Sequence, residues 1–523
     1  MLSKVLNSRI AIIFIIPFIL GIISIFSFAP FNFTIINFLT IPSLFLILTF
    51  VVKRSKSKYR IKPYLLNIFF VGYFFGIGFF LAGNYWISYS LTFDESFKNL
   101  IIFSVILIPL FLGIFFGVAT LIVGPLLKNN LISILLFCSS LSFMDYVRSK
   151  ILTGFPWNLW AYSWSWFPEV LQILNPIGLF AFNLLTLTIF CSTLLLLFKK
   201  KTVNYYFFFC LLLLFFSNYF YGSYLINKNF KVESFKSTEE NKSLHVKIIS
   251  PSFNLKYNLS EQEVSILIKK LVKYSEIDKR KKTLFIWPEG VFAGYTFSEI
   301  AKYKDIIRRN FSKNHTIIFG INTKLKDKYY NSLIAINNEF EIIYKYNKKK
   351  LVPFGEFLPF ENFLGKLGLK KITHGITSFS KGSFQKNIIF DSFNILPLIC
   401  YEIIFTELIQ DMNDKTNLII NISEDAWFGG SIGPHQHFAK AIFRAVESNK
   451  YLARSANQGV SAFINNNGQI IKSLKPNEAG NIELIVPLIN NKLRNKNDLI
   501  FFILLITYMT IFFTIKKFND DKK

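Results

Sequence analysis

Long apolar runs fill the first 226 residues, which restricts this part of the chain to an apolar environment. Only four of the 32 acidic residues occur there: Asp94, Glu95, Asp145 and Glu169. A helix needs about 20 apolar residues to cross the hydrocarbon core of a bilayer. Such runs occur near 10–28, 34–52, 64–84, 100–127, 131–147, 170–198 and 203–226, and an eighth covers 499–515. We therefore expect a polytopic α-helical membrane domain with about eight transmembrane helices.

Composition excludes several other classes of protein. Hydrophobic residues make up 52% of the 523 positions and charged residues 17%, which is not typical of disordered, collagenous or disulfide-stapled chains. The net charge of +27 first suggests a nucleic-acid partner. Lysine is abundant throughout, however, and cations favour one side of a membrane. We expect no nucleic-acid partner.

The positions of lysine and arginine predict how the chain crosses the membrane, because cytoplasmic loops retain cations. Cations precede the first apolar run, follow the second, fourth and sixth, and end the chain. These positions share one side if both termini are cytoplasmic, and only Arg148 with Lys150 disagrees. The interpretation places residues 227–495 on the outer face. The expected domains are 1–226, 227–495 and 496–523, the last a helix with a cytoplasmic tail.

The region 227–495 alternates short β-rich and helical segments, which is typical of an α/β layered domain. Expected strands lie at 244–249, 283–287, 316–319, 332–336, 342–344, 395–400, 417–422 and 460–464, and expected helices at 260–277, 403–412 and 436–449. Cys400 is the one cysteine of this region, since Cys138, Cys191 and Cys210 lie in apolar runs. A lone thiol in an oxidising compartment is either buried and inert or functional.

Three polar residues end or follow the apolar segments of this region. Glu289 follows Leu284-Phe285-Ile286-Trp287-Pro288, Lys348 follows Tyr346-Asn347, and Cys400 ends Ile395-Leu396-Pro397-Leu398-Ile399. Each alone has an ordinary explanation as a cap, a surface charge or a core residue. Together they match a thiol nucleophile, which needs a base for its proton and a cation where oxyanion charge develops.

Several motifs resemble the nitrilase superfamily and, among its branches, the apolipoprotein N-acyltransferases. They are Trp287-Pro288-Glu289, Tyr346 with Lys348 and Leu351-Val352-Pro353-Phe354-Gly355-Glu356, Cys400-Tyr401-Glu402, Asn421 with Ser423 and Asp425-Ala426-Trp427-Phe428-Gly429, and Tyr330-Asn331-Ser332. Asp145 with Arg148 and Thr153-Gly154-Phe155-Pro156-Trp157 match in the apolar half. Gly290 stands where the family more often has serine or threonine, and Asp145 replaces a more usual glutamate. The resemblance implies an αββα nitrilase-like sandwich beside the membrane helices.

The resemblance also implies a reaction. Cys400 would attack the sn-1 ester of a membrane phospholipid, such as phosphatidylethanolamine, with Glu289 as general base and Lys348 stabilising the oxyanion. The resulting thioester would acylate the α-amino group of a diacylglyceryl apolipoprotein. The resemblance implies no cofactor and no metal, a monomer, and a bacterial inner membrane with the catalytic domain on the periplasmic face.

Supporting residues are predicted by the same resemblance. Glu402 is expected to hydrogen bond Lys348, and Glu356 to contact a lid or place a second carboxylate near the thioester. Tyr401 and Trp427 are expected to shape the pocket. The remaining supporting residues are Tyr330, Asn331 and Trp157, and Trp157 could equally be an interfacial anchor. The apolar segments 291–297 and 354–367 are predicted lids at the lipid surface.

Other functions stay open at this point. His435 and His437 invite a zinc site, and Cys400 with His437 invites a protease-like dyad, although no His-Glu-x-x-His motif accompanies them. A membrane-anchored amidohydrolase acting on a small amide is the alternative enzyme. A transporter or scaffold whose outer domain only binds is the alternative outside enzymes.

Overall fold

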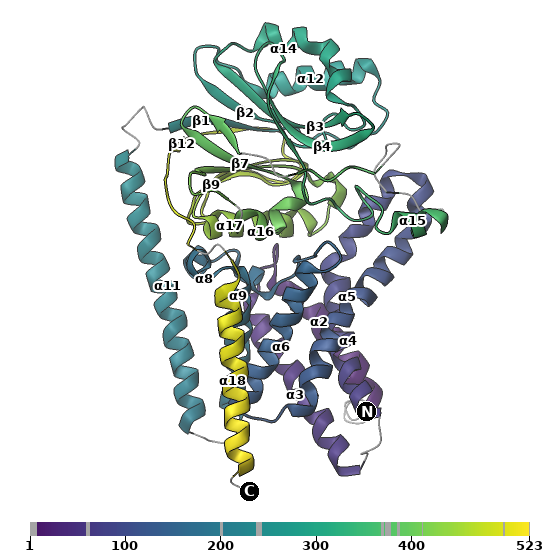
Figure 1. Cartoon of the computed structure of the whole chain (residues 1–523), viewed down its shortest axis with the longest axis vertical. Helices are drawn as coiled ribbons and strands as arrows, with labels where there is room; N and C mark the ends of the chain where they lie inside the picture. The colour runs from purple at the N-terminus through teal and green to yellow at the C-terminus, as the bar shows by residue number, and fades with distance from the viewer. Residues whose placement is uncertain are drawn as a thin grey trace. The chain divides into compact units, whose positions relative to one another are not determined.

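The computed structural model describes residues 8–58, 63–198, 202–236, 243–367, 371, 378–383, 387–410, 412–494 and 497–521 (Figure 1). The chain divides into two compact units. A helical unit comprises Met1–Ser88, Asn99–Tyr224 and Arg494–Lys523, and a sandwich unit comprises Tyr89–Lys98 and Leu225–Leu493. The segment Tyr89–Lys98 was expected in the membrane domain. Several cations used to orient the chain lie outside the described residues, among them Lys4, Arg60, Lys62 and Lys199.

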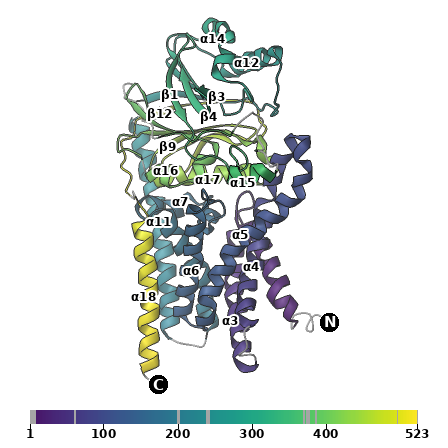
Figure 2. The ribbon, with the colours of Figure 1, turned by 45° about the vertical axis from the view of Figure 1, so that its right-hand side comes forward.

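The helical unit is a bundle of long apolar helices. Its main members are α2 (Ile16–Ser24), α3 (Asn37–Lys58), α4 (Pro63–Asn84), α5 (Ile101–Val123), α6 (Leu131–Lys150), α9 (Leu179–Cys191), α11 (Thr202–Lys236) and α18 (Leu499–Asp521). Seven helices among the described residues are long and apolar enough to cross a membrane. The first predicted run forms only the shorter apolar helix Ala11–Ser27. Helix η1 (Ala11–Ile15) leads into α2. In Figure 2, η1 and the C-terminal end of α18 both lie toward the same side of the helical unit.

The sixth predicted span is shorter than expected. Residues 168–177 form two separate turns, α7 (Pro168–Leu171) and α8 (Leu174–Ile177), before α9 begins. Gly178 separates α8 from α9 with a φ of +80°, a backbone conformation that side-chain-bearing residues rarely adopt. The apolar composition of 170–198 predicted one helix because it did not show this break.

Small residues bring α4 and α5 close together. A Cβ built on Gly76 would lie 2.9 Å from the Cα of Gly113, and one built on Gly72 would overlap the side chain of Thr120. Thr120 Oγ1 in turn lies 3.1 Å from the carbonyl oxygen of Ile68. Close backbone approach through glycine is typical of helices that pack in a bilayer, where van der Waals contact drives association.

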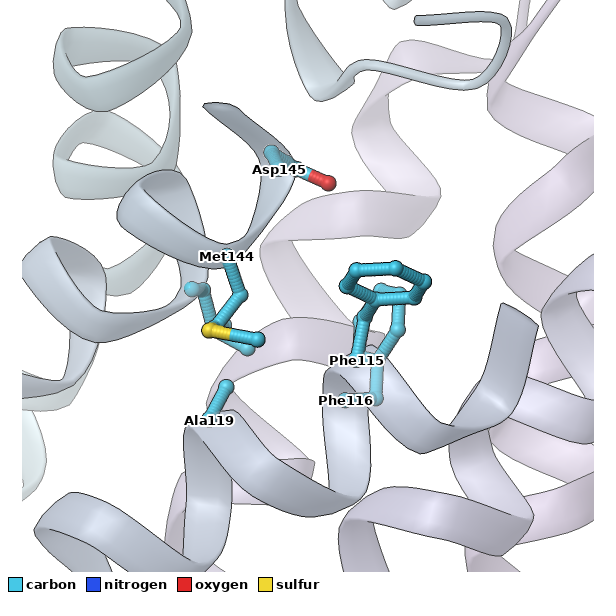
Figure 3. A pocket seen from close by; sticks show the side chains of 6 residues that line it. Phe115, Phe116, Ala119, Met144 and Asp145 are labelled. Carbon is cyan, nitrogen blue, oxygen red and sulfur yellow. The ribbon is translucent and has the colours of Figure 1, made fainter. Parts of the chain in front are cut away.

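A buried polar cluster lies at the end of α6. Arg148 pairs with Asp145 at 2.9 Å and donates to the carbonyl oxygen of Phe155, and Asn183 Nδ2 lies 3.1 Å from Asp145 Oδ2. The motif residues Asp145 and Arg148 therefore satisfy one another and hold the loop that carries Trp157. Figure 3 shows a small hollow beside this cluster, with Asp145 and Met144 of α6 facing Phe115 of α5.

Two six-stranded sheets form the sandwich unit. One sheet has the order β12-β1-β2-β3-β4-β5 and the other β11-β10-β9-β8-β7-β6. The inner strands β1, β2 and β3 run parallel, as do β7, β8 and β9. The strands are β1 (Ser243–Ser250), β2 (Thr283–Ile286), β3 (His315–Leu325), β4 (Lys328–Ile336), β5 (Ile342–Asn347), β6 (Ile388–Phe390), β7 (Phe393–Ile399), β8 (Leu418–Glu424), β9 (Tyr451–Asn457), β10 (Ser461–Ile464), β11 (Ile470–Leu474) and β12 (Gly480–Pro487).

Helices cover the outer face of each sheet (Figure 1), which confirms the predicted αββα sandwich. Helices α12 (Glu261–Ser275) and α14 (Lys304–Asn310) cover the first sheet, and α16 (Glu407–Gln410) and α17 (Gly433–Ser448) cover the second. One apolar core joins the inner faces of the two sheets, and a second lies between α12 and its sheet. Helix α12 begins with a capping box of Ser260 and Glu263.

Some elements of the sandwich were not predicted. Strand β9 is central and fully buried although it contains Arg454, Ser455 and Asn457. Its polarity hid it from a search for apolar alternation, because these side chains are paired inside the protein. The predicted helix 403–412 is instead η11 (Cys400–Ile404), a 3₁₀ turn, followed by the short α16.

Candidate active site

The polar residues of the site lie where parallel strands end. Cys400 follows β7, Glu424 ends β8 and Asn457 ends β9, so three neighbouring strands deliver side chains to one edge. Ligand sites in sheets with parallel strands commonly lie at this carboxyl edge. Cys400 opens η11 with a φ of +47°, a left-handed conformation rare for a residue with a side chain. The nucleophile candidate thus sits at a sharp turn between a strand and a 3₁₀ helix.

Strands of the other sheet bring a cation and two carboxylates together. Lys348 Nζ lies 2.9 Å from Glu356 Oε1 and 3.6 Å from Glu289 Oε1. Asn331 Nδ2 donates to both carboxylates, at 2.6 Å each. Glu356 Oε2 also accepts the N–H of Val352 at 2.8 Å. All four of the polar side chains are buried, so their charges act on one another with little screening by water.

The charges of this cluster act on the thiol of Cys400. Burial raises the pKa of Cys400, the charge of Glu289 raises it further, and the charge of Lys348 opposes both. For Lys348, burial alone would lower the pKa, but the carboxylates of Glu289 and Glu356 outweigh it and raise the pKa. The resting pair is therefore an uncharged thiol and a firmly charged ammonium. Such a thiol needs a base at the moment it attacks.

Glu402 holds the backbone around the site. Its carboxylate accepts the N–H groups of Ile399, Lys349 and Lys350, at 2.8, 2.6 and 3.2 Å, and the hydroxyl of Tyr346 at 2.9 Å. Burial raises the pKa of Glu402, and these donors counteract the rise. The prediction that Glu402 hydrogen bonds the Lys348 ammonium is wrong, because Glu356 occupies that place. Glu402 instead ties the segment after Lys348 to the strand before Cys400.

A second buried network lies behind Cys400. His437 Nε2 lies 3.2 Å from the carbonyl oxygen of Cys400, and its Nδ1 lies 3.1 Å from Arg454 Nη2 and 3.0 Å from Asp425 Oδ1. Burial and the Arg454 charge lower the pKa of His437 to about 4. The imidazole is therefore neutral and carries one N–H. Nε2 faces an acceptor, the Cys400 carbonyl, whereas Nδ1 faces both a donor, Arg454, and an acceptor, the Asp425 carboxylate.

Cys400, Asp425 and His437 are the residues on which the possible zinc site and the possible Cys–His dyad depend. Cys400, Asp425 and His437 each offer a ligand atom, and these atoms lie within 4.8 Å of one another. Arg454 pairs with Asp425 at 2.7 Å and places a guanidinium charge among them. A fixed cation at this place opposes a divalent ion by simple repulsion. His437 also contacts the backbone carbonyl of Cys400. A base in a dyad would contact the thiol instead, so this contact supports the backbone.

Aromatic rings extend from the site. Trp427 lies 6.1 Å from Tyr257 and 5.2 Å from Phe93, between ring centroids. Burial raises the pKa of Tyr257 well above its usual value, and the charges of Glu424, Glu289 and Glu356 add to this. Tyr257 therefore faces the carboxylates, and the ring of Trp427 connects it to the segment Tyr89–Lys98.

Comparisons with known proteins cover both units. Residues 20–192 match the model of the apolipoprotein N-acyltransferase N-terminal domain, and residues 256–494 match the carbon-nitrogen hydrolase model. The apolipoprotein N-acyltransferase of Rickettsia prowazekii is 30% identical over 483 residues, covering 90% of this chain and 92% of the relative. That of Brucella suis is 29% identical over 482 residues, covering 90% and 89%.

This chain belongs to the apolipoprotein N-acyltransferase family. It is a multi-pass membrane enzyme of lipoprotein maturation whose substrate is an apolipoprotein. Among solved structures, it is similar to a CN-hydrolase superfamily protein from Xanthomonas campestris, with a TM-score of 0.35 at 15% identity over 47% of this chain and 90% of the other. An amidase from Nesterenkonia sp. AN1 gives 0.34 at 15% identity, over 47% and 92%.

The other predicted site residues of this apolipoprotein N-acyltransferase family member lie in different places. Tyr401 is buried with its ring 5.0 Å from that of Phe405, and Tyr330 is half-buried on β4. Trp157 belongs to the helical unit, where its ring lies 4.7 Å from that of Trp86. The structure therefore brings Glu289, Lys348, Glu356, Asn331 and Cys400 together. For Tyr330 it shows only a place on the strand next to Asn331.

One predicted lid of this family member is wrong. Val291 and Phe292 are buried in the core beneath α12, so segment 291–297 packs internally. Phe354 and Phe360 of the other lid are 48% and 71% exposed. Both lids were predicted from their apolar composition. Composition alone does not distinguish a segment that packs against α12 and its sheet from one that lies at the surface.

Sequence reasoning missed four site residues of the family member: Glu424, Asn457, Arg454 and Tyr257. All but Tyr257 lie at or near the carboxyl ends of β8 and β9. Glu424 could have been found from its place next to the predicted strand 417–422, by the same argument that selected Cys400. Arg454 and Asn457 had no such signal, because their strand was itself unpredicted.

Proposed function

We propose that this chain moves an acyl chain from the sn-1 ester of a membrane phospholipid, through a thioester on Cys400, to the α-amino group of a diacylglyceryl apolipoprotein. The observation that carries the proposal is the buried group formed by Cys400, Glu289 and Lys348. Burial and the charge of Glu289 keep the thiol protonated until a base accepts the proton, while the charge of Lys348 opposes them. Phosphatidylethanolamine remains the expected donor.

The first half-reaction needs one proton acceptor and one stabilising charge. Glu289 takes the thiol proton as the sulfur of Cys400 forms a bond to the ester carbonyl carbon. Lys348 supplies the ammonium that stabilises the oxyanion developing there, and its raised pKa keeps it charged. The carbon–oxygen bond to glycerol then breaks, and Glu289 returns the proton to that oxygen. A lysophospholipid leaves and a thioester remains.

The second half-reaction reuses the same groups. The uncharged amine of the apolipoprotein attacks the thioester carbonyl, and Glu289 accepts the proton that the nitrogen loses. The carbon–sulfur bond breaks, and the proton passes to the Cys400 thiolate. Asn331 supports both steps, since it holds Glu289 and Glu356 side by side. No oxidant, nucleotide or other co-reactant is consumed in this scheme.

The membrane location of both substrates agrees with the helical unit. Extracting an acyl chain from a bilayer costs about 0.8 kcal/mol per CH₂ group. An enzyme that uses two lipid-anchored substrates therefore gains by working at the bilayer. We propose that both termini are cytoplasmic and that the sandwich unit lies on the periplasmic face of the inner membrane, with the enzyme acting as a monomer.

Mass spectrometry of the acyl-enzyme tests the function. The wild-type chain, in vesicles that contain phosphatidylethanolamine labelled in the sn-1 chain, should carry label on the peptide of Cys400. A diacylglyceryl peptide added afterwards should receive that label on its amine. Cys400→Ser should abolish labelling, whereas Cys210→Ser, which changes a cysteine in α11 of the helical unit, should not.

Three outcomes would decide against the proposal. A thioester that water discharges, with no transfer to the peptide amine, would favour the amidohydrolase alternative. A phospholipid pool that stays intact throughout would reject the lipid as donor. Labelling that persists in Cys400→Ser would reject the thioester route.

A further inference from the structure

Glu424 is a buried carboxyl group that the proposed mechanism does not use. It ends β8 and is 2% exposed. Its side chain accepts the N–H of Ala426 at 3.0 Å, as the N-cap of η12 (Asp425–Phe428). Asn457 Nδ2 approaches both of its carboxyl oxygens, at 3.0 and 2.9 Å. The side chain is thus held at two places.

The carboxyl group of Glu424 fills the space beside Gly290. A Cβ built on Gly290 would overlap Oε2 of Glu424 and lie 2.9 Å from its Cγ. Gly290 directly follows Glu289, so Glu424 packs against the backbone that carries the base. The absence of a side chain at 290, which departs from the family pattern, is what leaves room for Glu424.

Glu424 also contacts Glu289 directly, through its backbone. The Glu424 N–H donates to Oε2 of Glu289 at 3.1 Å, while Asn331 occupies Oε1. The direction of a backbone N–H depends on the dihedral angles of its residue. Because the Glu424 side chain caps η12 and is held by Asn457, it fixes those angles and therefore the direction of this donor.

Asn457 extends the same support to a second segment of the site. Its Oδ1 accepts the N–H of Phe253, and its Nδ2 donates to the carbonyl oxygen of Phe253, both at 2.8 Å. Segment 251–258 carries Tyr257, which faces the carboxylates. Glu424, through Asn457, thus positions the base and this tyrosine together.

The electrostatic surroundings of Glu424 favour its uncharged form. Burial raises its pKa well above the usual value, and the charges of Glu289 and Asp425 add to the rise. Donors from Asn457 and Ala426 oppose it. The pKa of Tyr257 is raised in turn by the charge of Glu424. These surroundings shift Glu424 toward its uncharged form relative to an exposed glutamate.

We propose that Glu424 is a positioning residue of the acyl transfer, whose side chain, packed on Gly290 and held by Asn457, aims Glu289 at the thiol of Cys400. The inference rests on the proposed function, because it concerns the base of that reaction. Both half-reactions use Glu289, so both should slow when Glu424 is truncated. The effect should fall on kcat, since Glu424 is buried and acts through the position of Glu289.

The test measures the rate of acyl-thioester formation on Cys400 in Glu424→Ala and Glu424→Gln. Small displacements of a catalytic group can cost about 100-fold in rate. We expect about that loss of kcat in Glu424→Ala with KM unchanged, and a loss below about threefold in Glu424→Gln, which keeps the shape of an uncharged carboxyl group. The ratio of the Glu424→Gln rate to the wild-type rate should rise with pH, because only the wild-type side chain can ionise.

Two glycines provide a matched pair of variants. Gly290 and Gly294 have φ values of +77° and +87°, so alanine strains the backbone at both. Gly294 has no atom within 4 Å of an added Cβ, whereas Gly290 meets Glu424. Gly290→Ala should therefore slow thioester formation much more than Gly294→Ala. If Glu424→Ala does not fold, this pair still decides the question.

Wild-type labelling separates failure of this inference from failure of the proposed function. A wild-type chain that forms and transfers no thioester contradicts the function itself. A wild-type chain that does so, while Glu424→Ala reacts at the wild-type rate, overturns only the role of Glu424. Equal losses in Glu424→Gln and Glu424→Ala, or in Gly290→Ala and Gly294→Ala, also overturn it.

Discussion

Nε2 of the His437 imidazole lies 3.2 Å from the carbonyl oxygen of Cys400. This contact supports the left-handed turn at which the thiol is presented, where φ is +47°. Burial and the charge of Arg454 lower the pKa of the imidazole, so it stays neutral. The histidine thus supports the backbone turn that carries the candidate nucleophile.

Acid should destabilise the sandwich unit through His437. Its pKa is lowered to about 4 from 6.5, so its contribution to stability is complete above pH 6.5 and is lost as the pH falls toward 4. The contribution is on the order of 3 kcal/mol. In thermal unfolding of the detergent-solubilised chain, His437→Gln should flatten this part of the pH profile. Burial also lowers the pKa of His435, a half-buried position on the same helix, so His435→Gln should flatten the profile less than His437→Gln does. Equal profiles for the two variants would contradict the assignment.

Alkylation of Cys400 should report the opposing charges around it. The pKa of the thiol is raised, so iodoacetamide should react slowly at neutral pH and faster as the pH rises. Glu289→Gln removes a charge that raises this pKa and should speed alkylation at a given pH. Lys348→Met removes a charge that lowers it and should slow alkylation. Mass spectrometry of the Cys400 peptide, in a Cys210→Ser background, measures both rates. Changes in the same direction would be inconsistent with the charge arrangement.

Asn331 should be needed to keep two carboxylates beside one ammonium. Asn331→Leu removes both hydrogen bonds, to Glu289 and Glu356, and leaves Glu289 Oε1, among the described residues, with only the ion pair to Lys348 at 3.6 Å. We expect thioester formation to fall about 100-fold with little change in KM. Asn338→Leu is the control, because that asparagine pairs with Glu339 on a half-buried turn. A normal rate in Asn331→Leu would show that Glu289 is positioned by its other contacts alone.

Phe354 and Phe360 should matter only for substrates in a bilayer. Both rings are exposed, and withdrawing a phenylalanine ring from apolar surroundings costs about 1.5–3 kcal/mol. The double replacement by serine should lower turnover on vesicles by at least about tenfold, the factor that corresponds to the lower end of this range for one ring. Turnover of a short-chain soluble ester should not change. Ile389→Ser, at a position 75% exposed on β6, controls for loss of an exposed apolar side chain. Equal losses on vesicle and soluble substrates would exclude a lid that contacts lipid.

Much of the architecture follows from composition because burial in lipid and burial between sheets both demand apolar residues. The runs near 34–52 and 499–515 predict their helices well. Glu289, Lys348 and Cys400 were found because each ends an apolar segment, and in a layered α/β domain such ends meet at common edges.

What the sequence could not indicate depends on contacts between distant segments. Arg454 lies in a buried strand because Asp425 and Asn421 pair with it, and neither is near in sequence. Glu424 has its place because Gly290, 134 positions earlier, leaves space for it. Whether Val291 belongs to a lid or a core depends likewise on α12, which covers it.

The short segment Tyr89–Lys98 limits how the catalytic part can be isolated. Phe93 contacts Trp427, and the ring of Tyr89 covers Gly429 so closely that a Cβ there would lie 2.8 Å from it. These two rings come from between two apolar helices, more than a hundred residues before β1. A recombinant fragment that begins after α11 would lack Phe93, so one side of the Trp427 ring would be exposed to solvent. The enzyme therefore has to be purified whole, in detergent or lipid, for its chemistry to be measured on an intact site.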